Sequence, residues 1–338
     1  MKKNKILVTG GLGFIGSHTV VELQREGFEV IIIDDLSNTR LEVLDGIFEI
    51  SNIRPEFVQL DLKEKEQVAT FFEEHKIDGV IHFAASKAVG ESVEQPLKYY
   101  ENNISTLVYL LKSMAKNNVP HLIFSSSCTV YGQADELPIT ENAPIKKAES
   151  PYGNTKQIGE EIIQDLTKAG NLTAIALRYF NPIGAHESAL IGELPLGVPQ
   201  NLIPYVTQTA AGIREELSVF GDDYPTPDGT AVRDYIHVVD LAKAHISALQ
   251  RLLNAKNKSK MEYFNVGTGT GSSVLEVINA FQKANHKEVK YKIVDRREGD
   301  ITAAYANTEL ANKELGWKAM LGLEEALASA WQWQLKQK

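Results

Sequence analysis

The chain has 338 residues, a length that favours two lobes or one domain with an elaborate second layer. Hydrophobic residues make up 43% and charged residues 23%, which is ordinary for a folded protein and excludes an intrinsically disordered one. The net charge of −9 argues against a nucleic acid or a membrane surface as partner, and the single cysteine, Cys128, excludes an internal disulfide.

The first predicted element is a strand over Lys5–Thr9. The lysines before it and the run Ile6-Leu7-Val8 are similar to the start of a signal peptide, but Thr9-Gly10-Gly11 ends that run after three residues. Elsewhere no apolar run is as long as a membrane span. Together with the lone cysteine, these features predict a cytoplasmic protein.

Short apolar segments alternate with helix-like segments over roughly the first half of the chain. The predicted strands are Lys5–Thr9, Glu29–Asp34, Glu56–Leu60, Gly79–Ala84, His121–Ser126 and Thr173–Tyr179. The predicted helices are Gly16–Glu26, Glu64–His75, Pro96–Asn117 and Ser150–Lys168. Strands nearly continuous in Val, Ile, Leu and Phe are typical of a parallel sheet buried on both faces. The pattern predicts an α/β fold with a doubly wound, Rossmann-like parallel sheet.

After Asn181-Pro182 the chain becomes rich in glycine and proline, most of all at 192–199 and 222–229. We interpret residues 182–229 as loops, and loops this long usually shape a binding site. The prediction is a first domain of residues 1–181 and a smaller C-terminal, substrate-binding lobe of residues 182–338. Within that lobe, residues 232–250 are a candidate for return to the first domain.

A glycine-rich turn connects the first strand to the first helix. Gly10, Gly13 and Gly16 have the spacing that permits a tight turn, a close approach to a pyrophosphate and close packing of the helix. Asp34, eighteen residues beyond Gly16 and followed by Asp35, ends the second strand. A carboxylate there accepts hydrogen bonds from ribose hydroxyls and repels a 2′-phosphate, which favours NAD over NADP. Without these companions, the glycines alone could be a bare turn.

A phenol and an ammonium group stand one helical turn apart in Tyr152-Gly-Asn-Thr-Lys156. A tyrosine with its ordinary pKa near 10 is a poor base at neutral pH, but a nearby lysine and a positive nicotinamide ring both favour the phenolate. We therefore predict that Tyr152 is the catalytic base, although such a pair on its own is more often part of a surface helix.

A serine cluster, Ser125-Ser126-Ser127, ends the fifth predicted strand, where ligands of open α/β sheets bind. Ser127 or Thr129 can pass a proton between a sugar hydroxyl and Tyr152. The other interpretation of the first two serines is backbone capping in a turn. Cys128 is expected to be a packed residue and not a nucleophile.

With these residues in view, the chain resembles the extended short-chain dehydrogenase/reductases, and among them the UDP-glucose 4-epimerases. The resemblance covers nearly the whole chain. Besides the glycine turn, the serine cluster and the Tyr–Lys pair, it is carried by the strings 82–92 (HFAASKAVGES), 178–186 (RYFNPIGAH), 232–237 (VRDYIH) and 296–300 (RREGD). One departure is Ala85, where bacterial relatives often carry glycine.

The resemblance implies that the cofactor is NAD and the substrate a UDP-sugar whose C4 is inverted through a 4-keto intermediate. It makes Tyr152 the acid and base at O4, with Ser127 assisting and Lys156 tuning Tyr152 and holding the nicotinamide ribose. The residues implied to contact NAD are Gly10, Gly13, Phe14, Ile15, Gly16, Asp34, Asp35, Asn38, Asp61, Leu62, Phe83, Ala84, Lys87, Asn102, Ser125, Tyr152, Lys156 and Tyr179. Those implied to contact the UDP-sugar are Ser127, Tyr152, Asn181, Asn201, Leu202, Phe220, Arg233, Arg297, Asp300 and Ala304.

Two of these implied roles have alternatives in the sequence. Asp61 can equally be a residue that starts a helix, and either arginine can be a surface salt-bridge partner. Ala304 stands where glucose-restricted relatives carry a tyrosine, so the resemblance implies that UDP-N-acetylglucosamine and UDP-N-acetylgalactosamine are also epimerised. The competing expectation is that the loop 190–198 refills the space a methyl group leaves.

Three rival functions are weighed against epimerisation. Nucleotide-sugar dehydratases carry two carboxylates just before Val-Tyr-Gly, where this chain has Cys128 and Thr129. A silent NAD-sensing protein commonly loses the Tyr–Lys pair, and a plain dehydrogenase would release NADH. The histidines lack metal-ligand spacing, so no metal is predicted. The resemblance also implies a homodimer bundled through helices 96–117 and 150–168.

Overall fold

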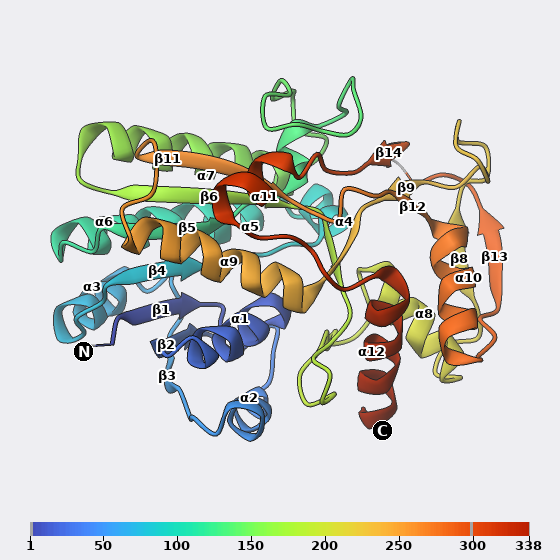
Figure 1. The fold of residues 1–338 in the computed structure, drawn as a ribbon, viewed down its shortest axis with the longest axis horizontal. Coiled ribbons are helices and arrows are strands. Elements are labelled where there is room, and N and C mark those ends of the chain that lie inside the picture. The colour runs from blue at the N-terminus through green and yellow to red at the C-terminus, as the bar shows by residue number, and fades with distance from the viewer. Residues whose placement is uncertain (1–2, 298–299, 338) are drawn as a thin grey trace.

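A computed structural model describes residues 3–297 and 300–337, and a parallel sheet of seven strands forms its centre (Figure 1). The strand order is β11-β6-β5-β4-β1-β2-β3. The strands are β1 (Lys5–Thr9), β2 (Glu29–Asp34), β3 (Glu56–Gln59), β4 (Gly79–His82), β5 (His121–Ser125), β6 (Thr173–Tyr179) and β11 (Met261–Val266). This confirms the predicted doubly wound α/β fold and all six predicted strands within one or two residues.

Helices cover both faces of the sheet. On one face lie α1 (Phe14–Arg25), α2 (Val43–Ser51) and α9 (Val238–Leu253), and on the other α3 (Lys65–Glu74), α6 (Thr106–Lys116) and α7 (Pro151–Ala169). The first strand shows why: Ile6 and Val8 join one apolar cluster, Leu7 joins the other, and all three are fully buried. A strand apolar at every position is stable only between two layers.

A smaller assembly stands beyond the carboxyl ends of the strands, at the right of Figure 1. Its helices are α8 (Leu202–Ala210), α10 (Val274–Asn285) and α12 (Leu323–Lys336). Its short strands form three small sheets: β7 (Asn181–Ile183) with β10 (Tyr235–His237), β8 (Leu217–Phe220) with β13 (Tyr291–Val294), and β9 (Val232–Arg233) between β12 (Ser272–Ser273) and β14 (Ala303–Ala304). The finding of α8 and β8 corrects the interpretation of residues 182–229 as loops throughout.

The chain returns from the smaller assembly to the sheet. After β10, α9 packs against α1, and β11 then pairs with β6 in parallel register, from Met261 beside Ala174 to Val266 beside Tyr179. The residues predicted to return, 232–250, include β9, β10 and most of α9. The division at residue 181 into two domains stays a prediction, and the sheet itself draws on both parts.

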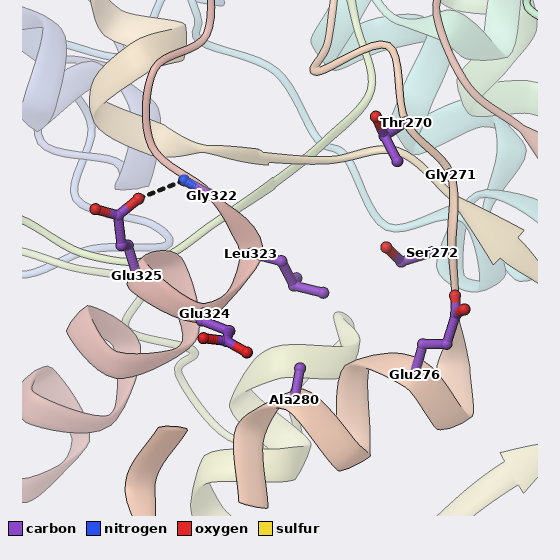
Figure 2. A pocket seen from close by; sticks show the side chains of 9 residues that line it. All are labelled: Thr270, Gly271, Ser272, Glu276, Ala280, Gly322, Leu323, Glu324 and Glu325. Carbon is purple, nitrogen blue, oxygen red and sulfur yellow. Dashed lines mark hydrogen bonds between the residues drawn. The ribbon is translucent and has the colours of Figure 1, made fainter. Parts of the chain in front are cut away.

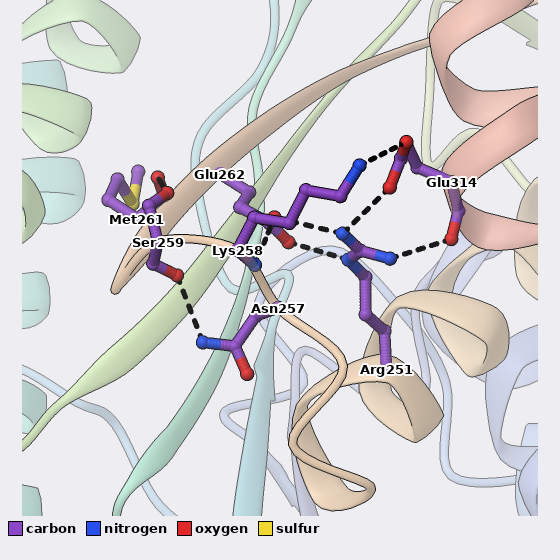
Figure 3. Close-up of polar contacts among 7 residues, drawn as sticks. All are labelled: Arg251, Asn257, Lys258, Ser259, Met261, Glu262 and Glu314. Carbon is purple, nitrogen blue, oxygen red and sulfur yellow. Dashed lines mark hydrogen bonds and ion pairs between the residues drawn. The ribbon is translucent and has the colours of Figure 1, made fainter.

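A charged network fastens this returning segment (Figure 3). Arg251, near the end of α9, donates to both oxygens of Glu262 on β11, at 2.7 and 3.0 Å, and to Glu314 on α11 (Glu309–Leu315) at 3.1 Å. Lys258 in the intervening loop reaches Glu314 at 2.6 Å. Because Arg251 and Glu262 are both buried, each charge needs the other to compensate for lost hydration.

The predicted helix 96–117 is built in three parts: α5 (Pro96–Tyr100), a π-helical turn at Glu101–Ser105, and α6. It follows α4 (Val89–Glu94). The widened turn carries Asn103, whose side chain donates to the Ser86 carbonyl oxygen at 2.9 Å and to the Thr155 hydroxyl at 3.0 Å. A π turn inside a helix is frequent at functional sites, because it re-aims a side chain. Within residues 3–297 and 300–337, no helix is long and apolar enough to cross a bilayer.

Candidate active site

The turn between β1 and α1 can be made only with glycine. Gly10 has a φ of +67°, and a Cβ there would lie 2.8 Å from the amide nitrogen of Ala84. A Cβ on Gly16 would lie 2.2 Å from the Gly10 carbonyl oxygen, and Gly13 is the residue before the helix. Phe14 and Ile15 form the first turn of α1, which no side chain caps. The glycine turn of residues 10–16, called the cofactor cradle below, exposes backbone amides at the start of a helix. This arrangement fits the pyrophosphate of a dinucleotide.

The carboxylate of Asp34 is tied to this turn. Its oxygens accept hydrogen bonds from the amides of Leu12, at 3.1 Å, and Leu36, at 3.0 Å. Burial raises the pKa of Asp34 above its ordinary value, while the two amides act in the opposite direction. Asp35 accepts from the amide and hydroxyl of Ser37, and the next predicted contact, Asn38, is exposed. Ionised carboxylate oxygens have lone pairs left for two ribose hydroxyls.

Further predicted cofactor residues follow β3 and β4, and one, Asn102, lies in the π-helical turn. Asp61 accepts from the amide of Lys63 in the turn before α3, and Leu62 is buried. Phe83 packs against the His245 ring, Ala84 lies against Gly10, and Asn102 donates to the Ser86 hydroxyl at 3.1 Å. Lys87, expected to reach the pyrophosphate, lies 3.4 Å from a carboxylate oxygen of Glu193, which also accepts from Asn201 at 2.5 Å.

Tyr152 and Lys156 project from one face of α7 and are both buried, at 7% and 5% exposure. The helix starts at Ser150, whose hydroxyl accepts from the amide of Gly153 and leaves Tyr152 in the first turn. The Lys156 ammonium donates to the Ser125 carbonyl oxygen at 2.7 Å and lies 5.8 Å from the centre of the Tyr152 ring. The Ser125 hydroxyl meets the Tyr179 hydroxyl at 2.9 Å. The structure therefore brings the serine cluster, Tyr152, Lys156 and Tyr179 together.

The chain by itself holds Tyr152 protonated. Burial raises its pKa well above 10 and Tyr179 raises it further, while the Ser127 hydroxyl lowers it. Burial lowers the pKa of Lys156 to about 8, against an opposing effect of the Glu160 carboxylate. A positive charge beside the phenol acts in the opposite direction to burial, and an oxidised nicotinamide ring has one.

Of the two candidate proton carriers, the structure favours Ser127. Its hydroxyl lies near enough to Tyr152 to affect the phenol, whereas the buried Thr129 hydroxyl has no hydrogen-bond partner among the described residues. Cys128 is partly buried, and desolvation raises the pKa of its thiol to about 12, which argues against a reactive thiolate.

Most of the predicted UDP-sugar residues lie on the short strands and loops of the smaller assembly. Arg233 donates to Asp300 at 2.9 Å, and Arg297 donates to the same carboxylate at 3.3 Å while its guanidinium stands 5.6 Å from the centre of the Phe220 ring. Arg233 pairs in register with Ala304 across β9 and β14. Glu298 and Gly299, inside the string 296–300, lie outside the described residues. Two guanidiniums sharing one carboxylate form a ready site for a pyrophosphate.

Asn181 and Leu202 begin β7 and α8, with Asn201 just before α8.

Comparisons with known proteins agree with this geometry. A family model described as GDP-mannose 4,6 dehydratase matches residues 7–330. A UDP-glucose 4-epimerase from Bacillus subtilis is 52% identical, over 97% of this chain and 96% of its own length. The mouse UDP-glucose 4-epimerase is 49% identical, over 98% and 96%. The chain belongs to the UDP-glucose 4-epimerase family. It is therefore an isomerase, as the sequence predicts.

Solved structures of epimerases superpose closely on this chain. The Stenotrophomonas maltophila UDP-glucose 4-epimerase, crystallised with NAD and formylated UDP-arabinopyranose, has a TM-score of 0.95 and 48% identity, over 99% of this chain and 98% of its own. The Bifidobacterium longum epimerase, in complex with NAD+ and UDP, has the same TM-score and identity, over 99% of both chains.

A separate hollow lies between the starts of α10 and α12 and is lined by none of the predicted site residues (Figure 2). Its lining includes the carboxylates of Glu276, Glu324 and Glu325, the last of which accepts from the Gly322 amide at 2.6 Å. Such an acidic lining repels a diphosphate. This hollow is therefore a poor candidate for the predicted diphosphate site.

Three residues that build the epimerase site escaped the sequence reasoning. Asn103 ties the loop after β4 to α7, and Glu193 holds Lys87 beside Asn201. The carboxylate of Asp234 accepts from the amides of Thr268, Gly269 and Ala306, and so fixes the loops that flank Arg233. Asp234 is fully buried, and its place in the sequence just before the apolar pair Tyr235-Ile236 is the signal that could have found it.

Proposed function

We propose that this chain interconverts UDP-galactose and UDP-glucose at C4 through a transient 4-keto sugar, with NAD bound throughout the cycle. The observation that carries the proposal is the buried meeting of Tyr152, Lys156 and the 125–127 serines next to the cofactor cradle. Support comes from relatives at about 50% identity named as UDP-glucose 4-epimerases, and from structural neighbours that hold NAD with UDP or a UDP-sugar.

Each protein group then has a role set by its position. Tyr152 takes the O4 proton and later returns it, and the Ser127 hydroxyl passes that proton to and from the sugar. Lys156 places a positive charge below the phenol and holds the end of β5 through the Ser125 carbonyl oxygen. Bound NAD supplies the acceptor and the donor of the C4 hydride. Arg233 and Arg297 exchange the Asp300 carboxylate for the substrate pyrophosphate, which anchors the nucleotide while the sugar turns over.

The direct test is an NMR time course of the purified protein with UDP-galactose and no added cofactor. We expect both UDP-hexoses to reach equilibrium without accumulation of NADH. A plain dehydrogenase would instead convert one UDP-sugar to an oxidised product and release NADH in equal amount. A silent NAD-binding protein would leave the spectrum unchanged while still carrying the dinucleotide. Either result would refute the proposal.

The proposal extends to the N-acetylated pair, UDP-N-acetylglucosamine and UDP-N-acetylgalactosamine. Support comes from the methyl side chain at Ala304, which lies beside Arg233 in the β9–β14 pair and is 2% exposed. A methyl group in place of a phenol ring leaves room near the sugar 2-substituent. The same NMR experiment with UDP-N-acetylgalactosamine at high concentration tests this, and no conversion would contradict it.

We further propose that the protein is a cytoplasmic homodimer, paired through helices 96–117 and 150–168. Support comes from apolar side chains left exposed beside these helices: Val93 on α4 is 62% exposed and Leu97 on α5 is 80% exposed. Burying such residues against a second copy would remove apolar surface from water. Light scattering after size exclusion measures the mass, and a monomer of 37.4 kDa would contradict the homodimer.

A further inference from the structure

A buried ion pair between α7 and β6 has no role in the chemistry described so far. Arg178, on β6, donates to both oxygens of Glu160, on α7, at 2.9 and 2.6 Å. The two side chains are 6% and 7% exposed. A buried pair of this kind is weak evidence for a gain in stability, because desolvating both charges offsets their attraction. Its position suggests a different use.

The Glu160 carboxylate accepts a third hydrogen bond, from the serine cluster. The Ser126 hydroxyl donates to it at 2.6 Å, and Ser126 is completely buried. Glu160 lies four residues after Lys156 and eight after Tyr152, so the three side chains are stacked along one face of the helix. The carboxylate therefore joins the catalytic helix to the end of β5.

The two neighbours of Ser126 are the residues that touch the catalytic pair. The Ser125 carbonyl oxygen accepts from Lys156 at 2.7 Å, and the Ser127 hydroxyl lies beside the Tyr152 phenol. Ser126 is thus the central one of three consecutive residues, and its side chain points away from the reacting groups to Glu160. A shift of Ser126 would move both neighbours relative to α7.

We propose that the Ser126–Glu160 hydrogen bond is a positioning contact for the epimerisation reaction, with Arg178 holding Glu160 in place. It sets the distance between the end of β5, which carries Ser125 and Ser127, and the face of α7, which carries Tyr152 and Lys156. Misplacing a reacting group by about 1 Å can cost on the order of 100-fold in rate. The inference rests on the proposed function, because it assigns a task within that reaction.

The network offers a matched control on its far side. The other end of the Arg178 guanidinium donates to the Tyr131 hydroxyl at 3.0 Å, and that hydroxyl donates to Asn265 at 2.7 Å. Tyr131 is also fully buried. Tyr131→Phe removes one hydroxyl from the same network without touching the Ser126–Glu160 bond, whereas Ser126→Ala removes that bond and leaves the ion pair intact.

The experiment measures kcat and KM for UDP-galactose, together with Tm, in the intact chain and both variants. We expect Ser126→Ala to lower kcat by about 10- to 100-fold with KM within twofold, and Tyr131→Phe to leave kcat within twofold, with similar decreases in Tm. If kcat of Ser126→Ala stays within twofold of the parent, or Tyr131→Phe loses as much rate, the network is only structural and the inference is overturned. Failure of the parent chain to epimerise would overturn the proposed function instead. Should Ser126→Ala not fold, Ser126→Cys keeps the side-chain volume, replaces the O–H by a weak donor and is held to the same thresholds.

Discussion

The tightest constraint in the cofactor cradle is at Gly16, and Gly16→Ala tests it. A Cβ at this position would lie 2.2 Å from the Gly10 carbonyl oxygen and 2.8 Å from the Gly11 Cα. Ordinary contacts of a Cβ begin at 3.4 Å, so the turn and the helix must separate by more than 1 Å. Both clashing atoms belong to the backbone and cannot rotate away.

Overpacking of this kind costs about 1–3 kcal/mol. Each kcal/mol lowers Tm by roughly 2–4 °C in proteins of about 150–250 residues, and by somewhat less in a longer chain. A separation of this size would also move the backbone amides of the turn out of hydrogen-bonding distance of a pyrophosphate. We therefore expect Gly16→Ala to lose both several degrees of Tm and most of its bound dinucleotide.

The assay is the molar ratio of NAD released on denaturation to protein, with Tm from a thermal shift. Gly90→Ala is the control, because a Cβ on this α4 residue would meet no heavy atom of the described structure within 4 Å. It should keep both the parent's NAD content and its Tm. If Gly16→Ala also keeps the parent values of both, the cradle is not where the dinucleotide binds.

Three further variants test the two sides of the site. Tyr152→Phe should lower kcat by about 10²–10⁴-fold with KM nearly unchanged, because the ring's packing survives, and a near-normal kcat would show that Tyr152 is not the base. Arg297→Ala should mainly raise KM for UDP-galactose. The control is Arg296→Ala, which removes a guanidinium stacked on Tyr224 and paired with exposed Asp223, and it should leave KM within twofold. Equal effects of the two variants on KM would argue against a pyrophosphate site at Arg297. Ala304→Tyr should abolish turnover of the N-acetylated UDP-sugars and spare the plain hexoses. Loss of both activities would show that the ring disrupts the neighbouring cluster of Val130, Tyr131 and Ile139.

The sequence predicted the fold best where burial alone determines the residue types. Strands β1 to β6 were predictable because burial on both faces demands apolar residues at nearly every position. Strand β11 was missed because its sequence, Met-Glu-Tyr-Phe-Asn-Val, contains two polar residues that are nevertheless buried. Glu262 is compensated by Arg251 and Asn265 by Tyr131, and neither partner is close in the sequence.

The same reason limits what the sequence says about the site. Tyr152, Lys156 and the glycines are recognisable from local spacing. The Lys87–Glu193 contact spans 106 positions and the Ser126–Glu160 contact spans 34, so only the folded chain reveals them. The direction of the Tyr152 pKa shift was also out of reach, because it depends on burial, which raises this pKa and which local spacing does not reveal.

The sequence separation between β11 and its sheet neighbour β6 has a consequence for folding during synthesis. Its neighbour in the sheet, β6, ends at Tyr179, and about 80 residues follow before Met261 begins β11. At roughly 5–20 residues per second, a ribosome needs several seconds to synthesise that segment, and meanwhile β6 presents an apolar edge with unpaired amides and carbonyls. Nascent chains are therefore most open to edge-to-edge association during this interval, and a fragment that stops at residue 181 would carry the same edge permanently.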